Sequence, residues 1–405
     1  MSEADERVLD YPLPAPEALE PPAEWDELRQ RCPVSRAKLP SGDEVALLTR
    51  YADVKQVLSD DRFDRQLNQP DAARLSDTDS GGVFNSEMSS TLPQGGEGHL
   101  RWRRLLNRWF TAKRTNALRP EIAGMAEQLI DEMIASGHPA DLKAGLGFPL
   151  PVWVICDVLG VPSDDRDRFS RWSDMFLNLT RFTGEEVKTA EREFFEYMRD
   201  HITAKREDPG EDVLSELIAA TAEEGEPMSD KQLAATGLGL LIAGHETTAN
   251  MIGKMVAMLL ADRDRWRALV ADRTLVRTAV EESLRFDANS GLGTVRYLGE
   301  DADVAGVELP RGTTVMCSMA AANRDAEAFE GAAEMDLSRS PNPHLAFGAG
   351  VHSCLGQALA RTELQVTLEV LLEKLPTLEL AVPAEQLRQL EGLVVGGLRE
   401  VPVRW

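Results

Sequence analysis

The chain has 405 residues, of which 43% are hydrophobic and 28% charged, the composition of an ordinary soluble globular enzyme rather than of a disordered or fibrous protein. Its 44 lysines and arginines are outnumbered by 68 aspartates and glutamates, so the net charge is −24. A surface of this sign repels phosphate backbones and anionic lipid, which argues against nucleic acid and membranes as partners.

The N-terminal residues indicate a cytoplasmic protein. The stretch MSEADERVLDYPLP carries acids where a signal peptide would carry a basic and then an apolar segment, and no segment approaches the ~20 apolar residues that span a bilayer. Cys32, Cys156, Cys317 and Cys354 are far apart and form no C-x-x-C pair. They therefore suggest neither a disulfide framework nor a zinc knuckle.

The first elements along the chain form a small sheet. Val34–Leu39 and Glu44–Thr49 are short strand candidates on either side of a Pro-Ser-Gly-Asp turn, which predicts a hairpin. From Ala52 onward most of the chain has a helical pattern. The exception is Gln69–Gly98, which is rich in Gly and Asp and predicts a long functional loop, with a disordered surface insertion as the alternative.

A long helix is predicted in the second half of the chain. Ser229 and Gln232 form a capping box, and no proline interrupts the pattern before about Ala261. A helix of ~32 residues would be ~48 Å long and would cross the core. After it we expect an irregular stretch from Gly312 to Pro343, a helix after Gly356 and a hairpin over Val394–Trp405. The prediction is one mainly α domain, residues 1–405, with small β-sheets.

A cysteine loop precedes the last predicted helix. It runs from Phe347 to Gly356 and sets Cys354 among three glycines, which let backbone N–H groups approach a sulfur atom closely. The positive end of the following helix favours a thiolate, which is the kind of ligand that haem iron takes. Two alternatives are a small buried hydrophobic cysteine and a zinc site with His344 and His352, although the zinc site lacks a fourth ligand.

This loop resembles the cysteine signature of the cytochrome P-450 superfamily, F-x-x-G-x-H-x-C-x-G, and the match continues to Arg361. The resemblance covers nearly the whole chain and is to soluble bacterial members of one domain. It implies haem b (iron protoporphyrin IX) with Cys354 as the metal ligand, sandwiched between the long helix and the cysteine loop, and O2 as co-substrate. It further places four residues against the haem: Phe347, Gly348, Gly356 and Ala243.

The long helix carries the motif Ala243-Gly244-His245-Glu246-Thr247-Thr248, which resembles the family's distal motif. The resemblance implies that Glu246 and Thr247 are catalytic and deliver protons during O2 activation in a dry pocket. Alternatively, Thr247 would only bond to a helix carbonyl, and Glu246 would be a solvated charge. Gly239, Ala243 and Thr247 share one helix face, which suits either a flat cofactor or close helix packing.

Further family positions follow from the resemblance. Glu282 and Arg285 match E-x-x-R, with Arg339 as the third member of a structural triad. The haem propionates are assigned to four cations or donors: His99, Arg103, Arg296 and His352. For Arg103 the alternative is a surface charge. The substrate pocket is assigned to seven residues: Leu92, Gly239, Leu240, Leu292, Thr294, Val394 and Val395.

The sequence departs from the family beside the predicted pocket. Many relatives carry a proline after the E-x-x-R helix, whereas Phe286–Gly291 has none, and Met335 stands where an aromatic residue is usual. Analogy with the substrate of any one relative is therefore unsafe.

The resemblance predicts a monooxygenase that hydroxylates or epoxidises a small, mostly apolar molecule of secondary metabolism. The chain has no G-x-G-x-x-G of its own, so electrons would come from a ferredoxin and its reductase. From Glu97 to Arg119 there are seven Lys or Arg and one Glu, which suits docking of an acidic partner. Two alternatives remain open, oxidative coupling or rearrangement without oxygen retention, and a non-catalytic haem-thiolate sensor.

Overall fold

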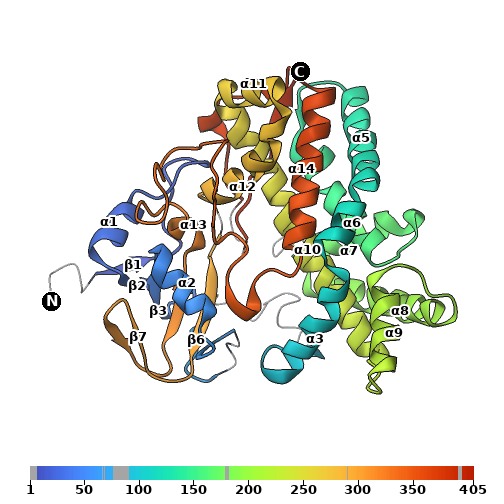
Figure 1. Cartoon of the computed structure of the whole chain (residues 1–405), viewed down its shortest axis with the longest axis horizontal. Coiled ribbons are helices and arrows are strands. Elements are labelled where there is room, and N and C mark those ends of the chain that lie inside the picture. The colour runs from blue at the N-terminus through green and yellow to red at the C-terminus, as the bar shows by residue number, and fades with distance from the viewer. Residues whose placement is uncertain are drawn as a thin grey trace. The chain divides into compact units, whose positions relative to one another are not determined.

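The computed structural model describes residues 7–65, 67, 69–75, 91–177, 182–289, 291–390 and 395–405. The chain divides into two compact units. Unit 1 comprises Met1–Asp79, Gly253–Cys354 and Leu372–Trp405, and unit 2 comprises Ser80–Ile252 and Leu355–Leu371. Helices prevail and the sheets are small (Figure 1), so the predicted mainly α class is confirmed.

Unit 1 contains a six-stranded sheet of order β1-β2-β3-β9-β6-β4. Its strands are β1 (Val8–Asp10), β2 (Val34–Lys38), β3 (Glu44–Leu48), β4 (Phe63–Asp64), β6 (Thr294–Leu298) and β9 (Thr314–Cys317). The predicted hairpin is confirmed, because β2 and β3 pair antiparallel from Val34↔Leu48 to Lys38↔Glu44.

Strand β3 is buried on both faces, which explains its unbroken apolar sequence. Ala46 and Leu48 enter a cluster with Val54 and other side chains of one face. Val45 and Leu47 enter a second cluster on the other face, with Leu9, Leu28 and Met316 among its members. A central strand between two apolar layers cannot show the alternation of a half-exposed strand.

The remaining elements of unit 1 are mostly short helices. They are α1 (Glu24–Arg31), α2 (Tyr51–Ser59), α11 (Arg263–Ala271), α12 (Val276–Phe286), α13 (Met319–Ala322), a two-stranded β7 (Ala302–Val304) and β8 (Val307–Leu309), and an antiparallel pair β10 (Glu379–Leu380) and β11 (Pro402–Arg404). The predicted irregular stretch from Gly312 to Pro343 is therefore wrong in part, since it contains β9 and α13. Both are too short to give a periodic pattern.

The predicted C-terminal hairpin over Val394–Trp405 is also wrong, because its strands pair with other segments than predicted. Residues 397–399 return along residues 388–390, with a bridge between Gln389 and Leu398 and a hydrogen bond from Leu390 N to Gly397 O. The last strand, β11, pairs instead with β10. The first arm of the hairpin that contains Gly397 begins before Val394.

In the described residues of unit 2, β5 (Ala140–Asp141) is the only strand and the other elements are helices. Unit 2 contains α3 (Gly96–Trp109), α4 (Ala112–Ala117), α5 (Arg119–Ser136), a π-helical turn (Lys143–Gly147), α6 (Pro149–Val158), α7 (Arg166–Leu177), α8 (Gly184–Glu207) and α9 (Val213–Glu223). Helices α7 and α8 pack through edge-to-face aromatic pairs that centre on Phe169, Trp172 and Phe194. Such pairs add to the stabilisation that burial of their area gives.

Two helices run from one unit into the other along the chain. They are α10 (Asp230–Ala261), of 32 residues, and α14 (Gln357–Lys374). The predicted capping box opens α10: Ser229 N donates to Gln232 Oε1 (3.0 Å), and Gln232 N donates to Ser229 Oγ (3.3 Å). The predicted long helix and the predicted helix after Gly356 are both confirmed.

The predicted loop Gln69–Gly98 is shorter than expected, because α3 already begins at Gly96. Its first residues are tied to the sheet of unit 1: Ala73 N donates to Thr314 Oγ1 (2.9 Å), and Asp71 Oδ1 accepts from the Tyr297 hydroxyl (2.8 Å). Residues 76–90, which include Phe84 and Met88, lie outside the described residues.

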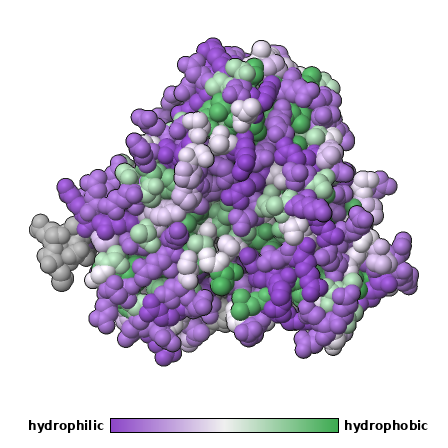
Figure 2. All heavy atoms as spheres, in the orientation of Figure 1, coloured by the Kyte–Doolittle hydropathy of each residue, from purple (hydrophilic) through white to green (hydrophobic). Residues whose placement is uncertain are grey.

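The surface in Figure 2 is dominated by hydrophilic residues, as the net charge of −24 leads one to expect. No helix in the described part of the chain is both long and apolar enough to cross a bilayer.

Candidate active site

The cysteine loop of unit 1 has a fixed backbone shape. Cys354 N donates to Phe347 O (2.8 Å), which closes the loop, and Gly348 and Gly350 both have φ of +69°. A Cβ at Gly350 would lie 2.5 Å from Leu58 O, so no larger residue fits there. Within this loop Cys354 is exposed. This geometry suits a thiolate presented to a ligand from a rigid support.

The same loop argues against a zinc site. Both ring nitrogens of His344 have protein partners, since Nε2 lies 3.1 Å from Glu281 Oε2 and Nδ1 accepts from Ala346 N (3.3 Å). Among the described residues there is no group of three or more His, Cys, Asp or Glu side chains suited to hold a metal ion. A haem iron, by contrast, needs a single protein ligand such as Cys354.

Arg296 fits a ligand that carries a carboxylate. It lies on β6 with 4% of its surface exposed, and its Nη1 donates to Val295 O (2.9 Å). No carboxylate of the described residues forms an ion pair with it, and burial together with the nearby Arg65 lowers its pKa. A buried guanidinium without an anionic partner is costly, and a haem propionate would supply that partner.

In unit 2 the middle of α10 presents the predicted distal motif. Ala243 and Thr247, one turn apart, are both exposed on this helix, and Glu246 is half-buried beside them. The Thr247 hydroxyl donates to Ala243 O (2.9 Å), the contact that the alternative interpretation of this residue predicted. This bond leaves the oxygen of Thr247 as a hydrogen-bond acceptor.

Burial changes the acidity of Glu246. It raises the pKa of this carboxyl to about 7, and the positive charge of Lys143 on the π-helical turn only partly offsets that rise. Glu246 therefore exchanges protons near neutral pH, which an ordinary solvated helix glutamate does not. Lys143 carried no signal in the sequence, because nothing local relates it to α10.

His245 supports α10 from its buried side. Its Nδ1 lies 2.6 Å from Ser173 Oγ, and its ring meets Phe148 edge to face at 4.3 Å. Burial lowers the pKa of His245 to about 4, so the ring is neutral at pH 7. The sequence placed His245 within the motif but gave it no role, since its partners come from α7 and from the residue before α6.

The predicted residues on α3 lie close to α10 in unit 2. Trp102 Nε1 donates to Thr236 Oγ1 (3.2 Å), which ties α3 to α10. His99 is buried one turn earlier, with its ring 6.2 Å from that of Trp102, and Arg103 is half-buried. Leu92 reaches Gly239, where a Cβ would lie 3.4 Å from Leu92 Cδ1. The structure thus brings together these two predicted pocket residues.

The predicted E-x-x-R triad is confirmed in unit 1. Arg285 donates from Nε and Nη2 to the Glu282 carboxylate (2.8 and 2.7 Å), and Arg339 Nε donates to it at 3.1 Å. Glu282 and Arg285 are fully buried. Asn342 Nδ2 is a further donor that sequence reasoning missed (3.0 Å). The triad ties α12 to the segment that precedes the cysteine loop, so its role is structural.

The predicted site residues divide between the two units. Unit 1 holds Arg296, Leu292, Thr294, Phe347, Gly348, His352, Cys354 and Val395, and unit 2 holds Leu92, His99, Arg103, Gly239, Leu240, Ala243, Glu246, Thr247 and Gly356. Val394 lies outside the described residues.

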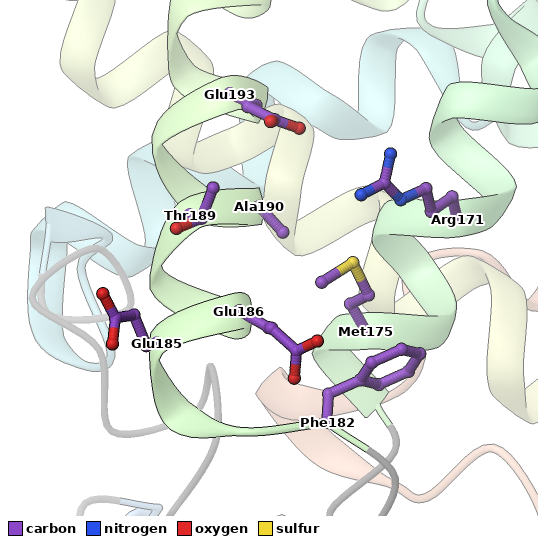
Figure 3. A pocket seen from close by; sticks show the side chains of 8 residues that line it. All are labelled: Arg171, Met175, Phe182, Glu185, Glu186, Thr189, Ala190 and Glu193. Atoms are coloured by element: carbon purple, nitrogen blue, oxygen red, sulfur yellow. The ribbon is translucent and has the colours of Figure 1, made fainter.

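A small cavity of about 220 Å³ lies between α7 and α8 (Figure 3). Arg171 and Met175 face it from α7, and Glu186 and Glu193 from α8. It contains none of the predicted site residues. Its volume is below the ~300 Å³ at which pockets for drug-sized molecules begin, so we do not assign it to the substrate.

Comparison with known proteins places this geometry in a family. Residues 24–386 match the family model for cytochrome P-450. The chain is 41% identical to the mycinamicin IV hydroxylase/epoxidase of Micromonospora griseorubida, over 100% of both chains. It is also 41% identical to the nocardicin C N-oxygenase of Nocardia uniformis subsp. tsuyamanensis, over 98% of both chains.

Solved structures agree with these relatives. The mixed-function cytochrome P-450 MycG aligns with a TM-score of 0.91 at 40% identity, covering 98% of this chain and 100% of the other. At this similarity the fold is shared over nearly the whole chain. With its cysteine loop, its distal motif and its E-x-x-R triad all in the expected order, the chain belongs to the cytochrome P-450 family and is a monooxygenase.

Proposed function

We propose that the protein binds haem b through Cys354 and uses O2 to hydroxylate or epoxidise a small, mostly apolar molecule of secondary metabolism in the cytoplasm. Thiolate-bound haem supplies the activation of O2 when it is present. Cys354 would be the iron ligand, and His99, Arg103, Arg296 and His352 would bind the propionates. Ala243, Phe347, Gly348 and Gly356 would line the faces of the ring.

The pair Glu246 and Thr247 carries this proposal. A carboxyl with a pKa of about 7 can take a proton from solvent and release it inside the site at neutral pH. Thr247 Oγ1, whose own hydrogen is bound to Ala243 O, can accept a hydrogen bond from a protonated group beside α10. A protein that only sensed a gas would have no need of a proton relay, so this pair favours an oxygenase.

The substrate class follows from the pocket residues and from the relatives. Leu92, Gly239, Leu240, Leu292, Thr294, Val394 and Val395 would give an apolar wall with few polar groups. The two relatives at 41% identity are named for reactions on mycinamicin IV and on nocardicin C, one hydroxylation or epoxidation and the other N-oxygenation. Both names denote elaborate natural products, which supports a secondary metabolite as the substrate here.

Electrons would come from a ferredoxin and its reductase. The structure modifies the docking surface expected on α3 and α4, because several of its arginines are already paired. Arg101 and Arg108 lie 3.1 and 3.7 Å from Glu224, and Arg114 pairs with Glu216 on α9. Arg104 and Lys113 form no ion pair among the described residues and are exposed. We therefore centre the ferredoxin site on Arg104 and Lys113.

The proposed function is tested by a compound panel and isotopically labelled O2. Mycinamicin IV and nocardicin C would be its first members, and binding would be followed as a shift of the ferric Soret band. The binding compound is then turned over with surrogate ferredoxin, reductase and NADPH. One labelled oxygen atom in the product is the expected result. A product without label would indicate coupling or rearrangement, and NADPH consumption that no compound stimulates would indicate a sensor.

A further inference from the structure

The segment after α12 is held by buried polar contacts at the place where many relatives carry a proline. At its start, Arg324 donates from Nε and Nη2 to Phe286 O (3.1 and 2.5 Å), with its guanidinium 3.4 Å from the centre of the Phe286 ring. Arg324 itself is 7% exposed. The carbonyl of Phe286, where the segment begins, is therefore held by the Arg324 cation. In relatives that carry a proline here, the proline ring would restrict the backbone instead.

Lys254 fixes the next residues. This side chain, 4% exposed, comes from the second half of α10. Its Nζ donates to Asp287 Oδ2 (2.5 Å) and to Asn289 O (2.7 Å), and the other carboxylate oxygen of Asp287 accepts from Asn289 N (3.0 Å). One ammonium group thus determines the path of the chain from Asp287 to Asn289. Backbone held in this way has little freedom to shift.

Asn289 passes this constraint to the C-terminal loop. Its Nδ2 donates to Gly397 O (3.0 Å) in a buried contact. Gly396 lies so close that a Cβ there would overlap atoms of Asn289. The position of the loop around Gly396 therefore depends on the position of Asn289. Lys254, Asp287 and Asn289 form a chain of contacts, called the Lys254 clamp below, that joins two loops distant in sequence.

Both loops lead into residues of the predicted substrate pocket. Leu292 and Thr294 lie three and five residues after Asn289, and Val395 immediately precedes Gly396. The Leu292 carbonyl accepts from the Tyr11 hydroxyl (2.8 Å), which fixes the far end of the first loop. We propose that Lys254 is a positioning residue for substrate, which sets the position of Leu292 and Val395 through the Lys254 clamp. This inference rests on the proposed function, because it takes these residues to be the pocket wall.

A loss of stability alone does not test this inference. Removing one partner of any buried ion pair leaves an uncompensated charge and destabilises the protein. Unit 2 offers a matched control, the buried ion pair of Lys205 and Asp212. Its Nζ and Oδ2 atoms lie 2.6 Å apart, and the two side chains are 15% and 5% exposed. It joins the end of α8 to the cap of α9 and touches no predicted pocket residue. Lys205→Met should cost stability to a similar extent as Lys254→Met.

The experiment compares two probes of the haem-loaded protein. Imidazole needs only the iron, whereas 4-phenylimidazole must also fit the pocket wall. We expect Lys254→Met to weaken the binding of 4-phenylimidazole about tenfold, equivalent to about 1.4 kcal/mol. The binding of imidazole should weaken less than about twofold. Lys205→Met should leave both dissociation constants unchanged. The red-shifted Soret band of the reduced CO complex confirms in each variant that the thiolate-bound haem is in place.

Hydrogen exchange measured by mass spectrometry gives a second readout that does not depend on haem chemistry. In Lys254→Met, exchange should accelerate over both 291–298 and 395–401, and in Asn289→Ala only over 395–401. Asn289→Ala is uncharged and milder, so it serves if Lys254→Met does not fold. Equal exchange in Lys254→Met and Lys205→Met, or equal weakening of the two imidazoles, would overturn the inference. The proposed function fails separately, if Cys354→Ala keeps the CO band.

Discussion

At Glu246 a common side chain acquires an uncommon proton affinity. The residue belongs to a helix face that is partly buried, and the loss of solvation outweighs the attraction of Lys143, so the pKa rises from 4.5 to about 7. Because the folded chain holds this proton to a higher pH than the unfolded chain does, the folded state is favoured by protonation. The contribution to stability is therefore full below pH 4.5 and is lost as the pH rises through about 7.

Glu246→Gln should abolish that dependence. We expect the free energy of unfolding of the wild type to fall, relative to the glutamine variant, between pH 4.5 and about 7, and the two curves to run parallel above that range. Urea titrations at half-unit intervals of pH measure the free energy of unfolding of both proteins. Parallel curves over the whole range would mean that Glu246 keeps the acidity of a solvated carboxyl.

Thr247→Ala should separate electron consumption from product formation. The variant keeps the helix and the haem but loses the acceptor oxygen beside the site, so reducing equivalents should leave as hydrogen peroxide. Loss of a positioned proton relay costs about 10²-fold in productive rate. The measurement is the ratio of product to NADPH, with peroxide determined in parallel. Thr248→Ala, one residue along and buried, is the control and should remain coupled.

Cys354→Ala should lose the red-shifted Soret band of the reduced CO complex, because no other thiol takes its place. Cys156 and Cys317 are buried, and burial raises the pKa of each thiol to about 12. Neither can present a thiolate at neutral pH. Cys32→Ala, at a half-buried cysteine of the same unit, should keep the band. A band that survives in Cys354→Ala would refute the assignment of the ligand.

Among the elements, α3 and α4 are the ones that we propose bind ferredoxin. Arg104→Glu should slow reduction by an acidic ferredoxin several-fold and leave the affinity for substrate unchanged, because the reversal acts on encounter rather than on the pocket. Arg199→Glu on α8 makes the same change of charge at another exposed arginine and should have little effect. Stopped-flow reduction of the ferric protein measures both. Equal rates of reduction in the two variants would show that the docking surface does not lie on α3.

The long helix α10 and the hairpin of β2 and β3 could be predicted from the sequence, but β9 and α13 could not. The capping box at Ser229 and the absence of proline defined α10, since both signals are local. Strand β9 and helix α13 have four residues each, too few for a periodic pattern, and β9 depends on its pairing with the neighbouring strands β3 and β6.

The predicted site shows the same division. The cysteine loop and the distal motif are contiguous in sequence, so their residue types and spacing sufficed. The pairing of Arg108 with Glu224 and the Lys254 clamp join residues that only tertiary structure brings together. The acidity of Glu246 likewise depends on Lys143 and on burial, neither of which a single helix reveals.

For the whole molecule, the net charge of −24 should make stability and partner binding respond to salt in opposite ways. Raising the ionic strength from 0.01 to 0.15 M shortens the Debye length from ~30 to ~8 Å and screens the repulsion among the carboxylates. The melting temperature should therefore rise while reduction by ferredoxin slows. Calorimetry and stopped-flow at matched salt measure the two. A melting temperature that falls with salt would show that surface ion pairs outweigh the repulsion.

The division of unit 1 and unit 2 along the chain determines when each can be completed during synthesis. Strand β3 pairs with β9, so residues 44–48 leave the ribosome long before their partner at 314–317 exists. Unit 2 needs residues 355–371, and unit 1 needs residues up to 405. Neither core can close until nearly the whole chain has emerged. Translation that stops before α14 thus yields a nascent chain with two open apolar faces, a substrate for chaperones and proteases rather than a partial enzyme.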